Sequence, residues 1–134
     1  AHEIRDCASR QLIRGVLDDK ARGVFQGKVR VAPDAQKTDG QQMSRALLLS
    51  RDAEADAKPE LEIFADDVVC SHGATVGELD ENLMFYLKSR GIAEEDARNM
   101  LIDAFLVDTL DEIEDPDFAA FMTSQINRWS LARR

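Results

Sequence analysis

Apolar and polar side chains alternate along the first part of the chain. Val29 and Val31 would lie on one face of an extended strand, with Lys28 and Arg30 on the other. Alternation with a period of two is typical of a β-strand that buries one face. The pattern predicts that residues 1–77 form a stack of short strands. Similar runs recur at 11–17, 46–50, 61–64 and 68–72.

Residues that favour turns separate these runs. Pro33–Asp34 and the segment 38–40 are expected to form tight corners. Lys58–Pro59 is expected to interrupt a strand, since proline has no N–H to donate to a ladder. The segment 73–77, bracketed by two glycines, is expected to lead out of the last strand. Both a β-sandwich and a β-solenoid fit this pattern, and no clean repeat favours either one.

The rest of the chain, 78–134, shows helical spacing and is expected to form a separate helical domain. Asp80 is expected to cap a helix over 81–90. Three acidic residues at 94–96 occupy the first turn of a second helix, where the helix dipole favours anions. Asp115–Pro116 is expected to start a third helix, with proline at its first position. The apolar stripe of the first two helices is wider than one neighbouring helix requires, so we expect a second partner for it.

The composition excludes several classes of function. The chain has 134 residues and a net charge of −9, which is unfavourable for binding nucleic acid or an anionic membrane surface. No apolar run approaches the roughly 20 residues that a membrane-spanning helix needs. Cys7 and Cys70 lie far apart in sequence, so we expect reduced thiols and a cytoplasmic location. The chain begins with alanine, and we expect it to be a piece of a longer protein.

Cys70 and His72 are the strongest candidates for chemistry. Residues two apart on a strand face the same way, so the thiolate and the imidazole would share a face. Both groups bind soft or borderline metals, and both occur as ligands of iron–sulfur clusters. Two ligands do not complete a site that normally takes four, so a metal site would have to be shared with another subunit. The structural alternative stays open, with Cys70 a small core residue and His72 a hydrogen-bonded polar group.

Two other catalytic arrangements are weaker on geometric grounds. A nucleophilic Cys–His pair is not expected, because side chains at i and i+2 of a flat strand stand roughly 6–7 Å apart. Asp66 and Asp67 would face opposite ways on a strand, so they cannot easily flank one glycosidic bond. At a corner, two such aspartates more often form turn hydrogen bonds.

Several segments of the chain form a recognisable set. They are GVFQGKVRV at 23–31, AQKTD at 35–39, RALLLS at 45–50, KPELEI at 58–63, ADDV at 65–68, CSHGAT at 70–75 and FYLKSRGI at 85–92. In order and spacing they resemble the SufB/SufD family of iron–sulfur cluster assembly proteins, and the ADDV-x-CSHGAT form is more similar to the SufD branch. The resemblance implies the C-terminal rungs of a right-handed parallel β-helix over 1–77, followed by a small helical domain over 78–134. Family members are much longer, so the chain would be a C-terminal fragment.

The resemblance implies a non-catalytic scaffold subunit of the SufBCD iron–sulfur cluster assembly complex. The chain would pair with a SufB-like subunit through the end of the β-helix, and its helical region would dock a SufC-like ATPase. His72 matches the family histidine near this interface, which is implicated in forming the nascent cluster, and Cys70 matches the cysteine beside it. The cluster would be transient and shared with the partner, so this chain alone would hold no cofactor. Because a cut β-helix exposes unpaired strand edges, we also expect a homodimer of the fragment.

In the helical region, Phe85, Tyr86, Arg90 and Ile92 are the expected contacts with the ATPase, through an apolar patch rimmed by charge. Packing of the two aromatic residues into the helical core is the competing interpretation. The family often has a serine or a similar cap where this chain has Ala93, and alanine has no side-chain acceptor.

Two alternative functions remain. A β-helix carbohydrate-active enzyme would use the Asp66/Asp67 region and predicts a pair of carboxylates across a long groove. A generic protein-interaction module would use Cys70 and His72 only structurally. That module predicts that His72→Ala leaves cluster assembly unchanged in the full complex.

Overall fold

The computed structural model describes residues 1–133, with side chains through residue 132. The chain divides into two compact units, Ala1–Gly77 and Glu78–Arg134, and the final residue of the second lies outside the described part. The first unit contains the strands and the second the helices, so the chain has a mixed α/β architecture.

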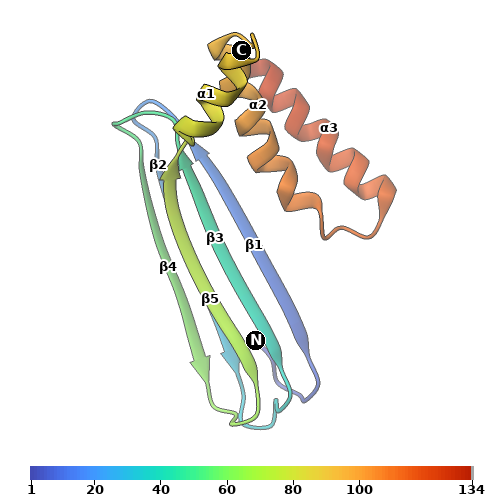
Figure 1. The fold of residues 1–134 in the computed structure, drawn as a ribbon. Coiled ribbons are helices and arrows are strands. Elements are labelled where there is room, and N and C mark those ends of the chain that lie inside the picture. Colours follow the sequence, from blue (N-terminus) through green and yellow to red (C-terminus); the bar gives the residue numbers. More distant parts are fainter. Residues whose placement is uncertain (134) are drawn as a thin grey trace. The chain divides into compact units, whose positions relative to one another are not determined.

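Five strands of ten residues each form the first unit, and consecutive strands alternate between two sheets. One sheet has the order β1-β3-β5 and the other pairs β2 with β4. Within each sheet the strands run parallel, and the two sheets run in opposite directions (Figure 1). Each expected strand run overlaps one of these strands, although the runs 46–50, 61–64 and 68–72 extend one or two residues beyond the observed bounds. Their bounds are β1 Ala8–Leu17, β2 Arg22–Val31, β3 Asp39–Leu48, β4 Glu54–Ile63 and β5 Val69–Glu78.

Backbone hydrogen bonds show how each circuit of the chain stacks on the one before. The Asp39 N–H donates to Cys7 C=O, and the Val69 N–H donates to Thr38 C=O, both at 2.9 Å. Asp39 pairs with Ala8 in the β1–β3 register, and the same bonding pattern aligns Val69 with Asp39. This alignment places side chains of successive circuits in columns across the sheet.

The expected interruption at Lys58–Pro59 is wrong, because β4 runs without a break from Glu54 to Ile63. The Glu54 N–H donates to Ala21 C=O and the Phe64 N–H donates to Val31 C=O, so even-numbered residues of β4 point their N–H groups toward β2. Odd-numbered residues point theirs away from β2. The missing N–H of Pro59 therefore falls on the unpaired side of β4, where its absence removes no bond of the ladder.

Two further boundaries differ from expectation. Asp39 and Gly40 begin β3 rather than completing a corner, and the segment 73–77 lies inside β5. Gly73 packs closely on its neighbouring strand, since a Cβ at this position would stand 2.8 Å from Met43 Cε. A glycine in a strand often marks such a close approach rather than an end. The expected turn at Pro33–Asp34 is confirmed.

The space between the two sheets holds a small core near one set of corners. Its buried residues are Val29, Val31, Ala32, Ala35 and Ala65, with Leu61, Val68 and Cys70 packed against them. Val29 and Val31 lie two residues apart on β2 and face the same way, as the alternation of apolar residues predicts.

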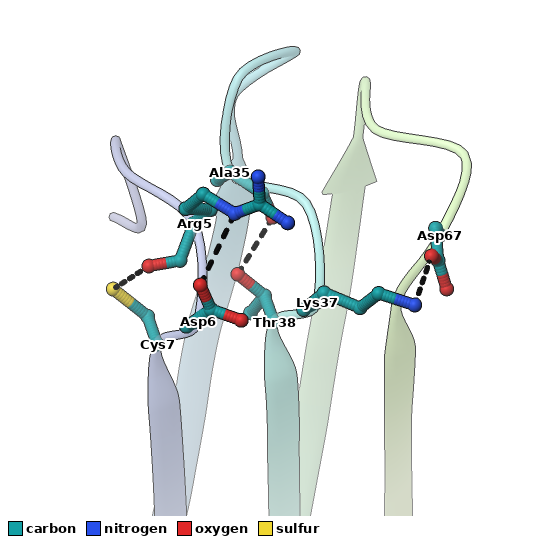
Figure 2. Close-up of polar contacts among 7 residues, drawn as sticks. All are labelled: Arg5, Asp6, Cys7, Ala35, Lys37, Thr38 and Asp67. Carbon is teal, nitrogen blue, oxygen red and sulfur yellow. Dashed lines mark hydrogen bonds and ion pairs between the residues drawn. The ribbon is translucent and has the colours of Figure 1, made fainter.

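The corners stack through the same kind of backbone bond. The Asp6 N–H donates to Gln36 C=O at 2.9 Å, and the Lys37 N–H donates to Asp67 C=O at 2.6 Å. Asp6 and Lys37 both adopt positive φ angles, of 59° and 64°. Figure 2 shows these corners side by side, with the Lys37 ammonium on the Asp67 carboxylate and Thr38 Oγ1 donating to Ala35 C=O.

Three α-helices and one short 3-10 helix make up the second unit. They are α1 Glu81–Ser89, α2 Glu94–Val107, η1 Asp108–Leu110 and α3 Pro116–Arg133. α2 packs against both α1 and α3, and its Ala97 and Ile102 are fully buried. Asp80 caps α1 as expected, and Asp115 accepts hydrogen bonds from two N–H groups in the first turn of α3. Gly91 follows α1 with φ of 87°, the left-handed conformation that glycine tolerates best.

The assignment of Ala93 as the N-cap residue of α2 can be tested by substitution. Ala93 has the extended backbone of a capping residue (φ −61°, ψ 148°) but forms no side-chain cap bond. We expect Ala93→Ser to raise the free energy of unfolding by about 1 kcal/mol, because its hydroxyl would accept an orphan N–H. Urea unfolding followed by circular dichroism measures this. Ala93→Val is the control without an acceptor, and equal midpoints for the two variants would contradict the assignment.

Candidate functional site

Cys70 lies on β5 with its side chain turned between the sheets. It packs against the core cluster, and its Sγ is 3.3 Å from the point where a Cβ at Gly40 would stand. Gly40 lies beside it on β3, which is the column that the hydrogen-bond register predicts. The thiol is half-buried and forms no disulfide. This environment matches the structural alternative for Cys70, a small residue of the core.

His72 follows two residues later on β5 and therefore projects from the same face as Cys70, as the spacing predicts. Its backbone aligns with Gln42 of β3 and Gln11 of β1. Unlike Cys70, the His72 side chain is exposed, and its imidazole makes no hydrogen bond to any residue in the described part of the chain. A side chain that faces inward and is still exposed shows that its part of the interior is open.

The opening arises because β5 is the last strand of its sheet. In the described residues no further strand pairs with its outer side. The Val69 N–H points toward β3, so by alternation the N–H and C=O groups of Cys70, His72 and Ala74 point toward the free side. From Val69 to Gly77 the strand carries no charged side chain unless His72 is protonated. A long, uncharged edge of this kind is a template for pairing with another strand.

The exposed edge of the other sheet has the opposite character. Besides Pro59, β4 presents outward charges that pair with β2: Asp56 Oδ2 lies 2.6 Å from Arg22 Nη2, and Glu62 Oε1 lies 3.0 Å from Lys28 Nζ. The hydrogen bond to Glu62 raises the pKa of Lys28 above its usual value. Charge and proline are standard devices that protect an edge from pairing. The outer sides of β4 and β5 thus differ, since of these two strands β4 carries the protective features.

Asp66 and Asp67 lie at a bend between β4 and β5, so the expected corner position is confirmed. The Asp67 carboxylate forms an ion pair with Lys37 Nζ at 2.5 Å (Figure 2). The backbone N–H of Asp67 donates to Gln36 Oε1. These contacts fit a role in holding the corner. They give no sign of the two facing carboxylates that a glycosidase needs.

A cavity of about 180 Å³ lies further along the same unit and is lined by residues of all five strands. Its wall combines small residues, such as Gly15, Ala46 and Ala57, with the apolar side chains of Ile13 and Phe25. Its one carboxylate belongs to Asp56, which is already paired with Arg22. The cavity therefore offers apolar volume rather than acid–base chemistry.

In the helical unit, the four expected docking residues lie on or just after α1. Phe85 is 74% exposed and Tyr86 is 53% exposed, so core packing does not account for them. The Arg90 guanidinium stacks over the Tyr86 ring, 5.1 Å from its centroid. Ile92 is half-buried and its N–H donates to Leu87 C=O. Phe85, Tyr86 and Arg90 thus form an exposed apolar patch with a cation, which we call the α1 patch.

The described residues contain neither a metal-binding cluster of side chains nor a membrane-spanning helix. No three or more His, Cys, Asp or Glu side chains gather there in a way that would hold a metal ion. Within the same residues, no helix combines the length and apolar character needed to cross a membrane.

Comparison with known proteins places the chain. The family model described as "SUF system FeS cluster assembly, SufBD core domain" matches residues 1–105. The chain belongs to the SufBD core family. It is 51% identical over 109 residues to the iron–sulfur cluster assembly protein SufD of Escherichia coli K12, covering 81% of this chain and 26% of that protein. It is 50% identical over 106 residues to a SufBD family protein of Synechocystis, covering 79% and 23%. SufD of Bacillus subtilis is 40% identical over 102 residues, covering 76% and 23%.

These similarities confirm the SufB/SufD resemblance and its SufD character. The chain spans about a quarter of the length of the curated relatives it matches. The name of each relative refers to iron–sulfur cluster assembly, and the SufBD core family connects this chain to the same process.

Sequence reasoning missed Gln42, which is only 2% exposed. It lies between the sheets, where its Nε2 donates to Gln11 Oε1 at 2.8 Å. The same Nε2 would stand 2.4 Å from a Cβ at Gly27 on β2, so a larger residue there would require a shift. The available signal was a glutamine at a position where the alternation of β3 expects an apolar residue.

The different environments of Cys70 and His72 predict different effects on stability. We expect Cys70→Ala to lower the free energy of unfolding by about 1 kcal/mol, because it removes a packed sulfur from the core. His72→Ala should change it by less than about 0.5 kcal/mol, because the imidazole is exposed. Thermal or urea unfolding compares the two variants. An equal loss in both would mean that His72 is a structural residue of the core.

Proposed function

We propose that this chain belongs to a non-catalytic scaffold subunit of an iron–sulfur cluster assembly complex of the SufBCD type. The single observation that carries this proposal is the placement of His72, an unpaired imidazole beside the free backbone of an uncharged edge strand. In the proposal, the five strands are the last rungs of a right-handed parallel β-helix. A SufB-like subunit adds a strand to β5 and so covers His72.

Strand addition suits β5 for two physical reasons. Every second residue offers its N–H and C=O to a partner, and pairing with a long strand satisfies the whole row at once. The side chains involved are small or neutral, so bringing a second backbone close removes little hydration from charges. Without the SufB-like subunit, the same edge would pair with a second copy of the fragment.

The cluster is the cargo of the complex rather than a resident cofactor of this chain. His72 offers one nitrogen ligand, whereas an iron–sulfur cluster normally takes four protein ligands. The SufB-like subunit would therefore supply the remaining ligands across the interface. Cys70 lies against the core, so its role in this proposal is to hold the β5 backbone in place beneath His72, and it is a ligand only if the strand shifts.

The α1 patch is the proposed docking surface for a SufC-like ATPase. Its exposed aromatic rings and cation are the side-chain types that dominate binding energy in protein interfaces. Closure of two ATPase subunits on ATP would move the two scaffold subunits relative to one another and so act on the site between them. The free thiols agree with a reducing compartment, and we place the complex in the cytoplasm.

A proline substitution tests strand addition at β5. The Ala74 N–H points to the free side, so Ala74→Pro should leave the β3–β5 ladder intact while blocking a bond to the partner. We expect affinity for the SufB-like subunit to fall by about tenfold or more, measured by calorimetry. Thr75→Pro is the matched control, since its N–H points to β3 and its loss should unfold the strand. Unchanged affinity of a folded Ala74→Pro variant would exclude this edge as the interface.

The α1 patch is tested separately. We expect Phe85→Ala and Arg90→Glu each to weaken binding of the SufC-like ATPase by about tenfold, without loss of stability, because both side chains are exposed. Phe118→Ala is the matched control, an equally truncated phenylalanine that is 51% exposed on α3. A comparable loss with Phe118→Ala, or none with the α1 variants, would place the ATPase elsewhere.

A further inference from the structure

Gln42 carries a polar atom that the described structure leaves unpaired. Its side chain is 2% exposed, and its Oε1 is buried without a hydrogen-bond partner. A buried acceptor without a donor is destabilising, and native proteins rarely leave one unexplained. This oxygen therefore has hydrogen-bonding capacity that no protein group of the described structure uses.

Gln11, Gln42 and His72 align across β1, β3 and β5, and this column indicates where a donor to Gln42 Oε1 would lie. Gln42 Nε2 donates to Gln11 Oε1, one strand back in the same sheet. An amide that donates toward β1 presents its oxygen to the opposite side, toward β5. The next residue of the column on β5 is His72, whose side chain projects from the same face.

The side-chain lengths of Gln42 and His72 match along this column. In glutamine Oε1 is three bonds from Cβ, and in histidine Nε2 is three bonds from Cβ through Cδ2. Paired residues on neighbouring strands hold their Cβ atoms side by side, so atoms of equal reach come together. Across the interior, glycine at position 27 leaves the space that the Gln42 amide occupies.

We propose that Gln42 is a positioning residue for His72. When a partner strand covers β5, the His72 ring loses water and its Nε2–H donates to Gln42 Oε1. This bond holds the neutral ring as the Nε2–H tautomer and leaves the Nδ1 lone pair as the atom that binds iron. Hydrogen bonds from the second ring nitrogen orient metal-binding histidines in the same way. The inference rests on the proposed function, because the partner supplies the cover.

The test measures the tautomer directly, without iron. The protein is labelled with 15N-histidine, bound to the unlabelled SufB-like subunit, and examined by solid-state NMR at a pH at which the ring is neutral. The His72 signals are identified by their loss in His72→Ala. Protonated and unprotonated ring nitrogens differ in 15N chemical shift, and we expect a single Nε2–H species in the complex. A mixture of tautomers, or an Nδ1–H species, would overturn the proposal.

Variants of β3 separate positioning from a general effect on folding. Gln42→Met keeps the length of the side chain but removes the acceptor, so the ring in the complex should return to a mixture of tautomers. Its affinity for the SufB-like subunit should persist, while retention of iron or cluster by the complex falls by about tenfold. Ser44→Ala changes a buried polar residue on the same face of β3, outside the His72 column, and should leave the tautomer unchanged. A Gln42→Met complex with an unaltered Nε2–H ring would refute the role of Gln42.

The binding and NMR results together also distinguish this inference from the function on which it rests. If no complex forms with the SufB-like subunit, both fail. If the complex forms and the ring shows no preferred tautomer, the scaffold function stands and the role of Gln42 is rejected.

Discussion

The first unit depends on one constraint: each strand obtains its hydrogen bonds from the strand one circuit earlier in the chain. The bonds from Asp39 to Cys7 and from Val69 to Thr38 repeat the same step. A β-strand has N–H and C=O groups on both sides. In this arrangement one side of each new strand bonds to the preceding strand of its sheet, and the other side is left for the next strand. The last circuit necessarily ends with an unsatisfied row. The side chains of the edge strand decide whether this row is protected from pairing with another strand.

The last strands of the two sheets differ in the residues that line their unpaired sides. On β4, proline stands where an N–H would face outward, and the exposed face carries ion pairs with β2. Exposed ion pairs of this kind contribute little to stability, and charges at an edge disfavour pairing with another strand. On β5, nine consecutive positions from Val69 carry neither proline nor a permanent charge. The outer side of β4 is thus protected against pairing with another strand, whereas the outer side of β5 lacks this protection.

Much of this architecture could be predicted from the sequence, because alternation and capping are local signals. The strand types, the corner at Pro33–Asp34 and the caps at Asp80 and Asp115 all follow from residues close together in the chain. The effect of Pro59 could not be predicted locally, since it depends on which side of β4 is paired. The close packing of Gly73 inside β5 depends likewise on Met43 of the neighbouring strand. Gln42 escaped notice because its partners, Gln11 and Gly27, come from two other strands.

The polar column and the open edge are linked by the same geometry. An apolar residue in place of Gln42 would pack as well against Gly27 and would avoid a buried unpaired oxygen, so hydrophobic stability alone does not favour glutamine here. In the proposed role, glutamine at position 42 would extend the hydrogen bond between β1 and β3 to His72 on β5. In a parallel sheet, aligned residues of neighbouring strands are evenly spaced, so the side chains of one column lie next to each other. The unpaired side of β5 and the column of Gln11, Gln42 and His72 thus meet on one strand, so the proposed recognition and the proposed ligand geometry would both depend on β5.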